Sequence, residues 1–295
     1  MNVFSYDFMV RALIGALVTG ATAPALGTYL VQRRLALIGD GIGHIALTGV
    51  GLGLLTSTSP VLAAVVVAAL GAIAVELVRE RGRTSGDIAL ALLFYGGISG
   101  GVFLVGLSGS RTNANLMAYL FGSPLTTSVS DLVVMAVLGA VVLAVTLLLR
   151  PWLFAICHDE EYARVSGLPV RLLNLTLAVT TAVTVTVAMR AVGLLLVSAL
   201  MVVPVATAQQ VTRGFRTTMA AAMGIGLLVA AAGIWAAGTY DTAPGATTVL
   251  VAIAGFLVVA VGVAIARAVR RTQARRQPAP DQPASAEPPD VVLTA

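Results

Sequence analysis

Apolar residues occur along this chain in long runs that short polar connections separate. Each run has about 20 residues, and a helix of that length crosses roughly 30 Å of hydrocarbon. Inside a bilayer every backbone polar group needs a partner within the protein, which an α-helix supplies from its own chain. The pattern therefore predicts an all-α bundle of transmembrane helices, with spans at residues 8–32, 36–56, 59–79, 87–108, 130–150, 171–190, 191–211, 217–238 and 244–267.

Two boundaries of this pattern decide the topology. The runs 171–190 and 191–211 are nearly continuous, so eight crossings remain an alternative to nine. Residues 1–267 are expected to form one transmembrane domain. Residues 268–295 are rich first in Arg and then in Pro, Ala and acids. Because such a composition cannot bury a core, we expect a disordered cytoplasmic tail there.

The composition agrees with a membrane protein. The chain is 58% hydrophobic and 11% charged, with a mean hydropathy of +0.96. A soluble domain carries about 25% charged residues, so we interpret the chain as a polytopic membrane protein. Its single cysteine, Cys157, excludes a disulfide or a cysteine-based metal cluster within one chain.

The basic residues are all arginines, and their positions predict the orientation. If the N-terminus is outside and the tail is cytoplasmic, fifteen of the eighteen arginines fall on the cytoplasmic side. The three exceptions are Arg11, Arg111 and Arg190. The high isoelectric point therefore reflects orientation, and no nucleic-acid partner is expected. A Walker A loop requires a lysine, so this chain is not itself a standard P-loop ATPase.

One predicted span carries an acid and an imidazole. Asp40 and His44 are four residues apart in the run 36–56, so they share one helix face one turn apart. A charged side chain in a bilayer costs at least a few kcal/mol and normally faces a bundle interior or a water path. A carboxylate and a neutral imidazole are ligands for divalent transition metals, so we expect a transported ion to bind here. The alternative is that the two side chains hydrogen-bond each other and hold helices together.

Four further features are candidates for functional roles. Residues 158–169 begin with acids and end with Gly and Pro, which predicts a short exposed helix with a clear start and stop. Pro204 interrupts the run 191–211 and is either a hinge or a tolerated kink. Asp241, between the last two spans, lines an entrance or caps a helix. The stretch 109–129 is too short in its apolar part to cross, and is either a surface helix or a gate for an extracellular partner.

Several stretches together resemble one family. The chain is similar to the membrane permease subunit of bacterial ABC importers for zinc, manganese or iron(II). The resemblance covers roughly residues 8–267, and five pieces in the same order carry it. These pieces are Gly39–His44, Tyr119–Ser123, Asp159–Leu168, Gly193–Ala208 and Ala243–Leu250.

The resemblance implies a fold, partners and a site. It implies a homodimeric permease of the metal/cobalamin type in the bacterial cytoplasmic membrane, with separate ATP-binding subunits below it and an extracellular metal-binding protein above it. Asp40 and His44 match the positions where members of this family contact the metal. The transported ion is expected to be Zn²⁺ or Mn²⁺, with Fe²⁺ as a third option. No permanently bound cofactor is expected. Pro204 and Asp241 are kept as hinge or gate candidates. The residues expected to couple the permease to the ATPase are Asp159, Glu160, Glu161, Tyr162, Ala163, Ser166, Gly167 and Leu168.

Two other classes of function compete with this one. An ion-coupled carrier or channel would use Asp40 and His44 as a proton relay and would transport without an ATPase. An intramembrane hydrolase fits poorly, because no HExxH, paired-aspartate or GxSxG signature is present, so no enzymatic activity is expected in this chain. A second ligand pair is also doubtful, because Asp241 is the only acid between residue 163 and the tail.

Overall fold

The computed structural model of the chain describes residues 7–80, 86–108, 120, 122 and 128–276. Its regular elements in these ranges are all α-helices, as the hydropathy pattern predicts. They are α1 (Asp7–Gln32), α2 (Ile38–Leu55), α3 (Pro60–Glu80), α4 (Gly86–Leu107), α6 (Val129–Leu148), α7 (Arg150–His158), α8 (Glu160–Val165), α9 (Val170–Val192), α10 (Leu194–Val211), α11 (Phe215–Tyr240) and α12 (Pro244–Arg276).

Nine of the described helices are long and apolar enough to cross a membrane, namely all except α7 and α8. The nearly continuous run is divided at Gly193, whose φ of +85° is a conformation that glycine adopts without a steric penalty. The chain turns there from α9 into α10, so these are two helices and not one. The described ranges therefore agree with nine spans.

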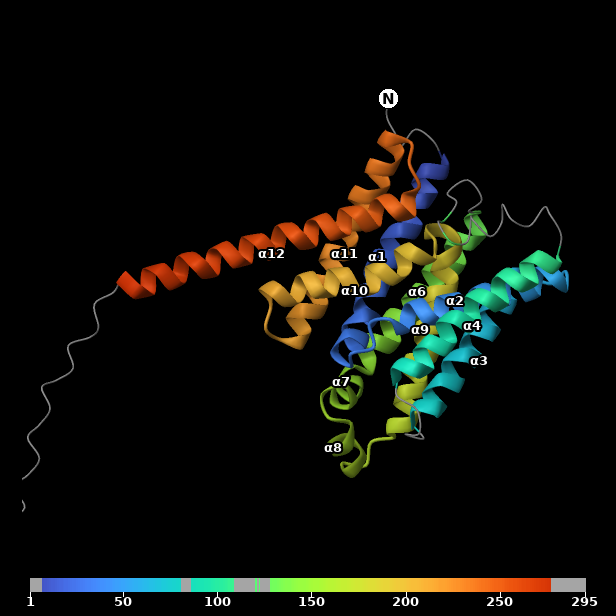
Figure 1. Cartoon of the computed structure of the whole chain (residues 1–295), viewed down its shortest axis with the longest axis horizontal. Helices are drawn as coiled ribbons and strands as arrows, with labels where there is room; N and C mark the ends of the chain where they lie inside the picture. Colours follow the sequence, from blue (N-terminus) through green and yellow to red (C-terminus); the bar gives the residue numbers. More distant parts are fainter. Residues whose placement is uncertain (1–6, 81–85, 109–119, 121, 123–127, 277–295) are drawn as a thin grey trace, which may run out of the picture.

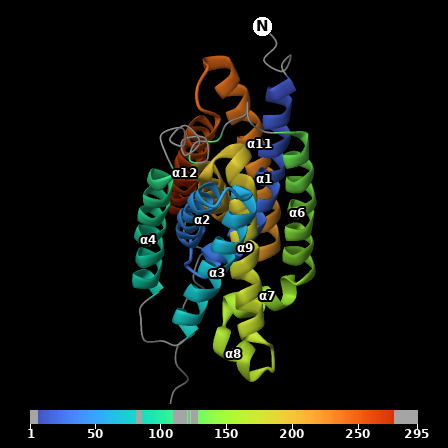
Figure 2. The ribbon, with the colours of Figure 1, turned by 90° about the vertical axis from the view of Figure 1, so that its right-hand side faces the viewer.

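The helices form two groups that α9 connects (Figure 1). In one group α1 packs against α6, α10 and α11, and α12 packs against α10 and α11. In the other, α2 lies between α3 and α4. Figure 2, turned by 90°, shows α1, α6, α9 and α11 running side by side.

Small residues allow these helices to approach closely, as is common in membrane bundles. A Cβ atom added to Gly20 of α1 would lie 2.7 Å from the carbonyl oxygen of Gly226 in α11. A Cβ atom on Gly27 would overlap the backbone of Met201 in α10. Glycine at these two positions is therefore what brings α1 into backbone contact with its neighbours.

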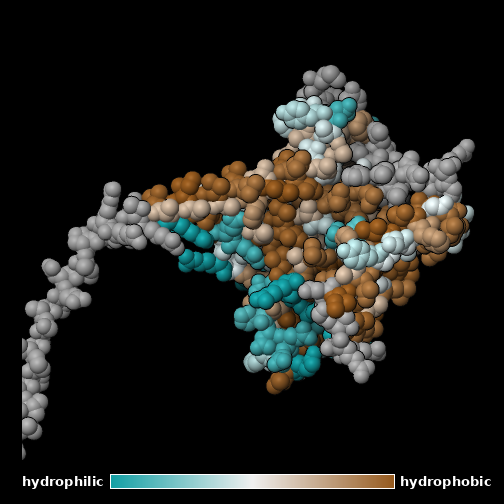
Figure 3. Space-filling model, viewed as in Figure 1, coloured by the Kyte–Doolittle hydropathy of each residue, from teal (hydrophilic) through white to brown (hydrophobic). Residues whose placement is uncertain are grey.

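Individual helices differ in how much of each is covered. Of the most apolar stretch of α2, 72% is buried, whereas the corresponding share of α12 is 6%. The exposed positions of α12 include Leu250, Leu257 and Val258, which are apolar and suit contact with lipid or with another protein. Figure 3 shows a mostly hydrophobic surface, with hydrophilic residues gathered at the end that carries α7 and α8.

Two boundaries differ from those predicted. The span expected at 130–150 ends at Leu148, and Pro151 in the first turn of α7 starts a separate helix, a position where its missing N–H costs nothing. At the other end, α12 continues past Arg267, the predicted end of the transmembrane domain, to Arg276. The polar arginines there do not end the helix because Arg is a good helix former. The rest of the predicted tail, 277–295, lies outside the described residues.

Candidate functional site

Asp40 and His44 lie one turn apart on α2, as their spacing predicts. The Nε2 atom of His44 is 3.7 Å from the Oδ1 atom of Asp40. The Asp40 side chain is 27% exposed and the His44 side chain 11%, so the pair is largely covered but reachable.

The spacing of these two atoms is too long for a direct hydrogen bond and is compatible with two ligands of one ion. A hydrogen bond from nitrogen to oxygen extends to about 3.2 Å. Two ligand atoms that each lie about 2.1 Å from one zinc ion at a tetrahedral angle are roughly 3.4 Å apart. A gap of 3.7 Å is therefore too long for the first arrangement and close to the second.

Three glycines make room for this pair. A Cβ atom on Gly39 would lie 2.8 Å from the sulfur of Met201 in α10, and one on Gly43 would overlap the side chain of Leu194, also in α10. Gly41 faces α4 near Leu93. The alternating glycines thus let α10 and α4 approach α2 on either side of the Asp40 and His44 face.

The imidazole of His44 is held by packing. The edge of the Phe94 ring meets it at a centroid distance of 4.4 Å and an interplanar angle of 73°. Gly97 of α4 lies against the His44 backbone, where an added Cβ atom would be 2.5 Å from the carbonyl carbon. The buried Nδ1 atom of His44 has no hydrogen-bond partner among the described residues, although metal-binding histidines usually donate this second N–H. The ring orientation therefore depends on Phe94 and on the close contact with α4.

One copy of the chain offers too few ligands for a closed metal site. Within the described ranges no group of three or more His, Cys, Asp and Glu side chains could hold a metal ion. Zinc in proteins is nearly always bound by four ligands. Asp40 and His44 thus offer at most two side-chain ligands of the four that such a site needs.

The predicted short helix is present as α8, Glu160–Val165. Asp159 precedes it, and the Asp159 side chain accepts a hydrogen bond from the backbone N–H of Tyr162 at 2.9 Å, which caps the helix. Gly167, with a φ of +80°, ends it, and the Leu168 N–H donates to the carbonyl oxygen of Ala163 at 3.1 Å. These two caps explain why so short a helix has sharp ends.

One face of α8 is buried and the other is free. Ala163 is 1% exposed, whereas Tyr162 is 70% and Val165 89% exposed. Glu161 and Ser166 are exposed as well. An apolar pair surrounded by polar side chains at the hydrophilic end of the molecule is the composition of a protein contact surface.

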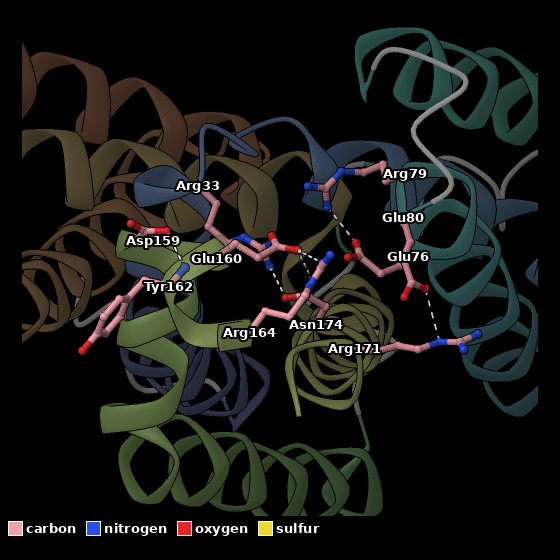
Figure 4. Close-up of polar contacts among 10 residues, drawn as sticks. All are labelled: Arg33, Glu76, Arg79, Glu80, Asp159, Glu160, Tyr162, Arg164, Arg171 and Asn174. Carbon is pink, nitrogen blue, oxygen red and sulfur yellow. Dashed lines mark hydrogen bonds and ion pairs between the residues drawn. The ribbon is translucent and has the colours of Figure 1, made fainter. Parts of the chain in front are cut away.

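Glu160 points to the opposite side, toward the end of α1 (Figure 4). Its Oε2 atom accepts from Nη2 of Arg33 at 2.7 Å, and Nη1 of Arg33 donates to Oδ1 of Asn174 in α9 at 2.7 Å. Asn174 in turn donates to Glu160 at 3.5 Å. The side chain of Arg33 is only 6% exposed, so this cluster ties α8, α9 and the turn after α1 together.

The other predicted site residues lie apart from this cluster. Pro204 is buried within α10, which continues through it to Val211. Asp241 is exposed and follows α11 in a left-handed conformation with a φ of +51°, so it lies at the C-terminal end of that helix and three residues before α12 begins. Roles for both as hinge or gate stay predictions. The Tyr119–Ser123 piece lies mostly outside the described residues.

Four residues of these clusters are missed by sequence reasoning: Arg33, Asn174, Phe94 and Gly97. The sequence assigns Arg33 only to membrane orientation, because its partners are more than a hundred residues away in the chain. For Gly97 a signal is present, because glycine pairs at 96–97 and 100–101 place small residues on one face of α4.

Nine candidate spans in the described residues, an acid and an imidazole one turn apart within one of them, and a capped helix at the polar end define a polytopic membrane protein. The model of the ABC 3 transport family matches residues 5–263, and the chain belongs to that family.

The relatives of the chain are named for several metals. The chain is 32% identical to the manganese transport system membrane protein MntC of Halalkalibacterium halodurans, over 85% of this chain and 86% of that protein. It is 31% identical to the chelated iron transport system membrane protein YfeD of Yersinia pestis, over 86% and 85%. It is 29% identical to the high-affinity zinc uptake system membrane protein ZnuB of Haemophilus influenzae, over 83% and 94%. Among solved structures, PsaBC from Streptococcus pneumoniae in complex with Fab matches with a TM-score of 0.77 and 27% identity, over 86% of this chain and 91% of that one.

Proposed function

We propose that this chain is the permease subunit of an ATP-driven importer that carries Mn²⁺, Zn²⁺ or Fe²⁺, and that Asp40 and His44 contact the ion as it crosses. The observation that carries the proposal is the 3.7 Å separation of two metal-ligand atoms inside an apolar helix. Holding a carboxylate and an imidazole there without a hydrogen bond between them costs stability, and a transported cation offsets that cost while it is bound.

Two copies of the chain would complete the ligand set. A two-fold axis beside α2 brings the same surface of each copy together, so that each residue of the pair meets its own copy. Two carboxylates and two imidazoles make four ligands, which suits a divalent ion. The likeness to PsaBC and the names of the relatives support an assembly of this class.

The cytoplasmic partners would be ATP-binding subunits that dock on α8. The support is the exposed pair Tyr162 and Val165 on a helix whose ends are fixed by Asp159 and Gly167. A metal-binding protein would deliver the ion on the opposite side, and the tail after α12 would be cytoplasmic.

Transport in this chain makes and breaks no covalent bond, so the chain acts by changing shape. ATP binding and hydrolysis in the partners would move α8 and rock the two copies, exposing the site first outward and then inward. Import requires that the outward state bind the ion more tightly than the inward state, because equal affinities would shift nothing.

The test is metal accumulation in bacteria that lack their own importers and express this chain with its ATPase and binding protein. Manganese, zinc and iron compete in the medium, so the winner names the substrate. Asp40→Ala, His44→Ala and an ATPase-dead partner should each abolish uptake. His158→Ala is the matched control, since it removes the only other histidine, which is exposed at the end of α7.

Uptake that survives the dead ATPase would contradict the ABC mechanism and favour an independent carrier. Uptake that needs the ATPase but ignores Asp40 and His44 would refute the site.

A further inference from the structure

Arg33 occupies an unusual place for a basic residue of a membrane protein. It follows the last residue of α1, yet its side chain is 6% exposed and does not reach into solvent. Both ends of its guanidinium are used, one on Glu160 at the start of α8 and one on Asn174 in α9, each at 2.7 Å (Figure 4). A planar guanidinium fixes the direction of two such bonds at once, which a single ammonium group cannot do.

The turn after Arg33 leads directly to the proposed metal site. Arg34 has a φ of +59°, and the N–H of Leu35 donates to the carbonyl oxygen of Leu30 at 2.8 Å, so the turn is closed by backbone hydrogen bonds. The N–H of Ile38, the first residue of α2, donates to the carbonyl of Leu35 at 3.0 Å. Asp40 follows in the first turn of α2. No flexible linker therefore separates Arg33 from Asp40.

The cluster is also costly to open. The Arg33 side chain is 6% exposed and that of Glu160 37%, so the guanidinium is the buried partner. Taking Glu160 away would leave that buried charge without its carboxylate, which is destabilising. Displacement of α8 by a cytoplasmic partner would either break the Arg33–Glu160 contact or carry the turn with it. If the turn moves together with α8, the buried guanidinium of Arg33 keeps its partner.

We propose that Arg33 is a positioning residue that passes the movement of α8, through Glu160, to the turn before α2 and so to the Asp40 and His44 pair. This rests on the proposed function and adds to it the physical connection between the ATPase-facing helix and the ion site. Asn174 keeps the guanidinium oriented while α8 moves.

The neighbouring ion pairs are unsuited to this role. Arg164 contacts Glu160 at 3.4 Å but belongs to α8 itself and is 66% exposed. Arg171 contacts Glu80 at 3.2 Å and joins α9 to the end of α3, and Arg79 contacts Glu76 within α3. Among the ion pairs of the described residues, Arg33–Glu160 is the one that joins α8 to the segment before α2.

The experiment uses the whole complex of this chain with its ATPase subunits in liposomes, supplied with metal-loaded binding protein. Metal import and ATP hydrolysis are measured together, and the result is the number of ions imported per ATP. The decisive variant is the double substitution Arg33→Met with Glu160→Met, which removes both charges of this pair, so no buried charge is left unpaired. Arg164 also loses its contact with Glu160, but its side chain is 66% exposed and stays in water. We expect it to assemble and to hydrolyse ATP, but to import about tenfold fewer ions per ATP, within the roughly 5–150-fold range of coupling between sites. Arg171→Gln, which removes an exposed arginine outside α8, should leave the ratio unchanged.

A double variant with the wild-type ratio would overturn the proposal, because the pair would then serve only to hold the fold. If the double variant fails to assemble, Arg33→Lys decides. It keeps the charge opposite Glu160 but cannot also orient on Asn174, so its ratio should fall, and an unchanged ratio would overturn the proposal. A wrong proposed function would give a different result. The wild-type complex would then hydrolyse ATP but import none of the three metals.

Discussion

Two polar clusters flank the turn between α1 and α2, and they are satisfied to very different degrees. On one side of the turn Arg33 bonds Glu160 and Asn174, each at 2.7 Å. On the other side His44 stands 3.7 Å from Asp40, and its Nδ1 atom has no partner in the described part of the chain.

The difference separates structural polar groups from functional ones. A buried charge with complete hydrogen bonding holds elements in register, and removing part of it costs stability. A polar pair that is buried and left incomplete lowers stability and persists where it serves a ligand. By this criterion the Arg33 and Glu160 pair is a firm connection between α8 and the turn before α2, whereas the Asp40 and His44 pair has the incomplete bonding that we expect of the proposed ion site.

The largest expected effect concerns the packing that positions His44. Gly97→Ala places a methyl group 2.5 Å from the His44 backbone, which cannot move aside as a side chain end can. We expect a loss of about 3 kcal/mol in the free energy of unfolding, together with loss of metal uptake. Gly96→Ala is the matched control, because a Cβ atom there meets nothing within 4 Å. Denaturant unfolding of both purified variants checks this, and equal stability would show that α4 does not fix His44.

The second effect measures how well the cluster around Arg33 is shielded from water. Cys157 of α7 lies beside it, and burial raises the pKa of its thiol to about 12, above an ordinary value of 9.0. Because the thiolate is the nucleophile and the raised pKa keeps the thiol protonated at pH 8, maleimide labelling should be on the order of 100-fold slower than in the unfolded chain and should rise with pH. A Cys157→Ala chain with Asp40→Cys should label faster, since the Asp40 side chain is 27% exposed. Rapid labelling of native Cys157 would contradict the burial.

The third effect compares the two clusters directly. Glu160→Gln leaves the Arg33 guanidinium buried without a carboxylate and should cost about 2 kcal/mol of stability. Asp40→Asn removes a carboxylate that no hydrogen bond compensates and should leave stability unchanged or higher, while abolishing uptake. The check is the unfolding midpoint of each variant beside its transport rate. A large loss of stability in Asp40→Asn would mean that the ion site is structural after all.

The smallest effect is expected at an exposed pair. Arg171 and Glu80 are 3.2 Å apart, with side chains 65% and 39% exposed. Solvent screens such pairs, so Arg171→Gln should change stability by less than about 0.5 kcal/mol and leave uptake intact. A larger change in the same unfolding assay would show that the contact between α9 and α3 contributes to the cluster around Arg33.

Much of the fold could be predicted because membrane helices are set by local composition. The spans required only runs of apolar residues, and α8 required only acids before it and a glycine after it. Asp40 and His44 could be found for the same reason, since a helix places residues four apart on one face. The division between α9 and α10 at Gly193 stays open in the sequence, because an apolar run continues across it.

The contacts between distant segments could not be predicted. Arg33 resembles an ordinary cytoplasmic arginine in the sequence, and only the packing of α8 and α9 brings Glu160 and Asn174 to it. Gly97 and Phe94 likewise gain their importance from the position of α4 against α2. Periodicity indicates which face of a helix is special, but not which helix covers it.

The most direct test of the central claim is the metal content of the purified permease–ATPase complex in lipid discs, measured together with the X-ray absorption spectrum of the bound ion. The account predicts one divalent ion for every two copies of the chain, with imidazole nitrogen in its coordination shell. His44→Gln should lose that ion, while His158→Ala should retain it. An ion that stays bound at the same ratio and with the same spectrum in His44→Gln would contradict the account.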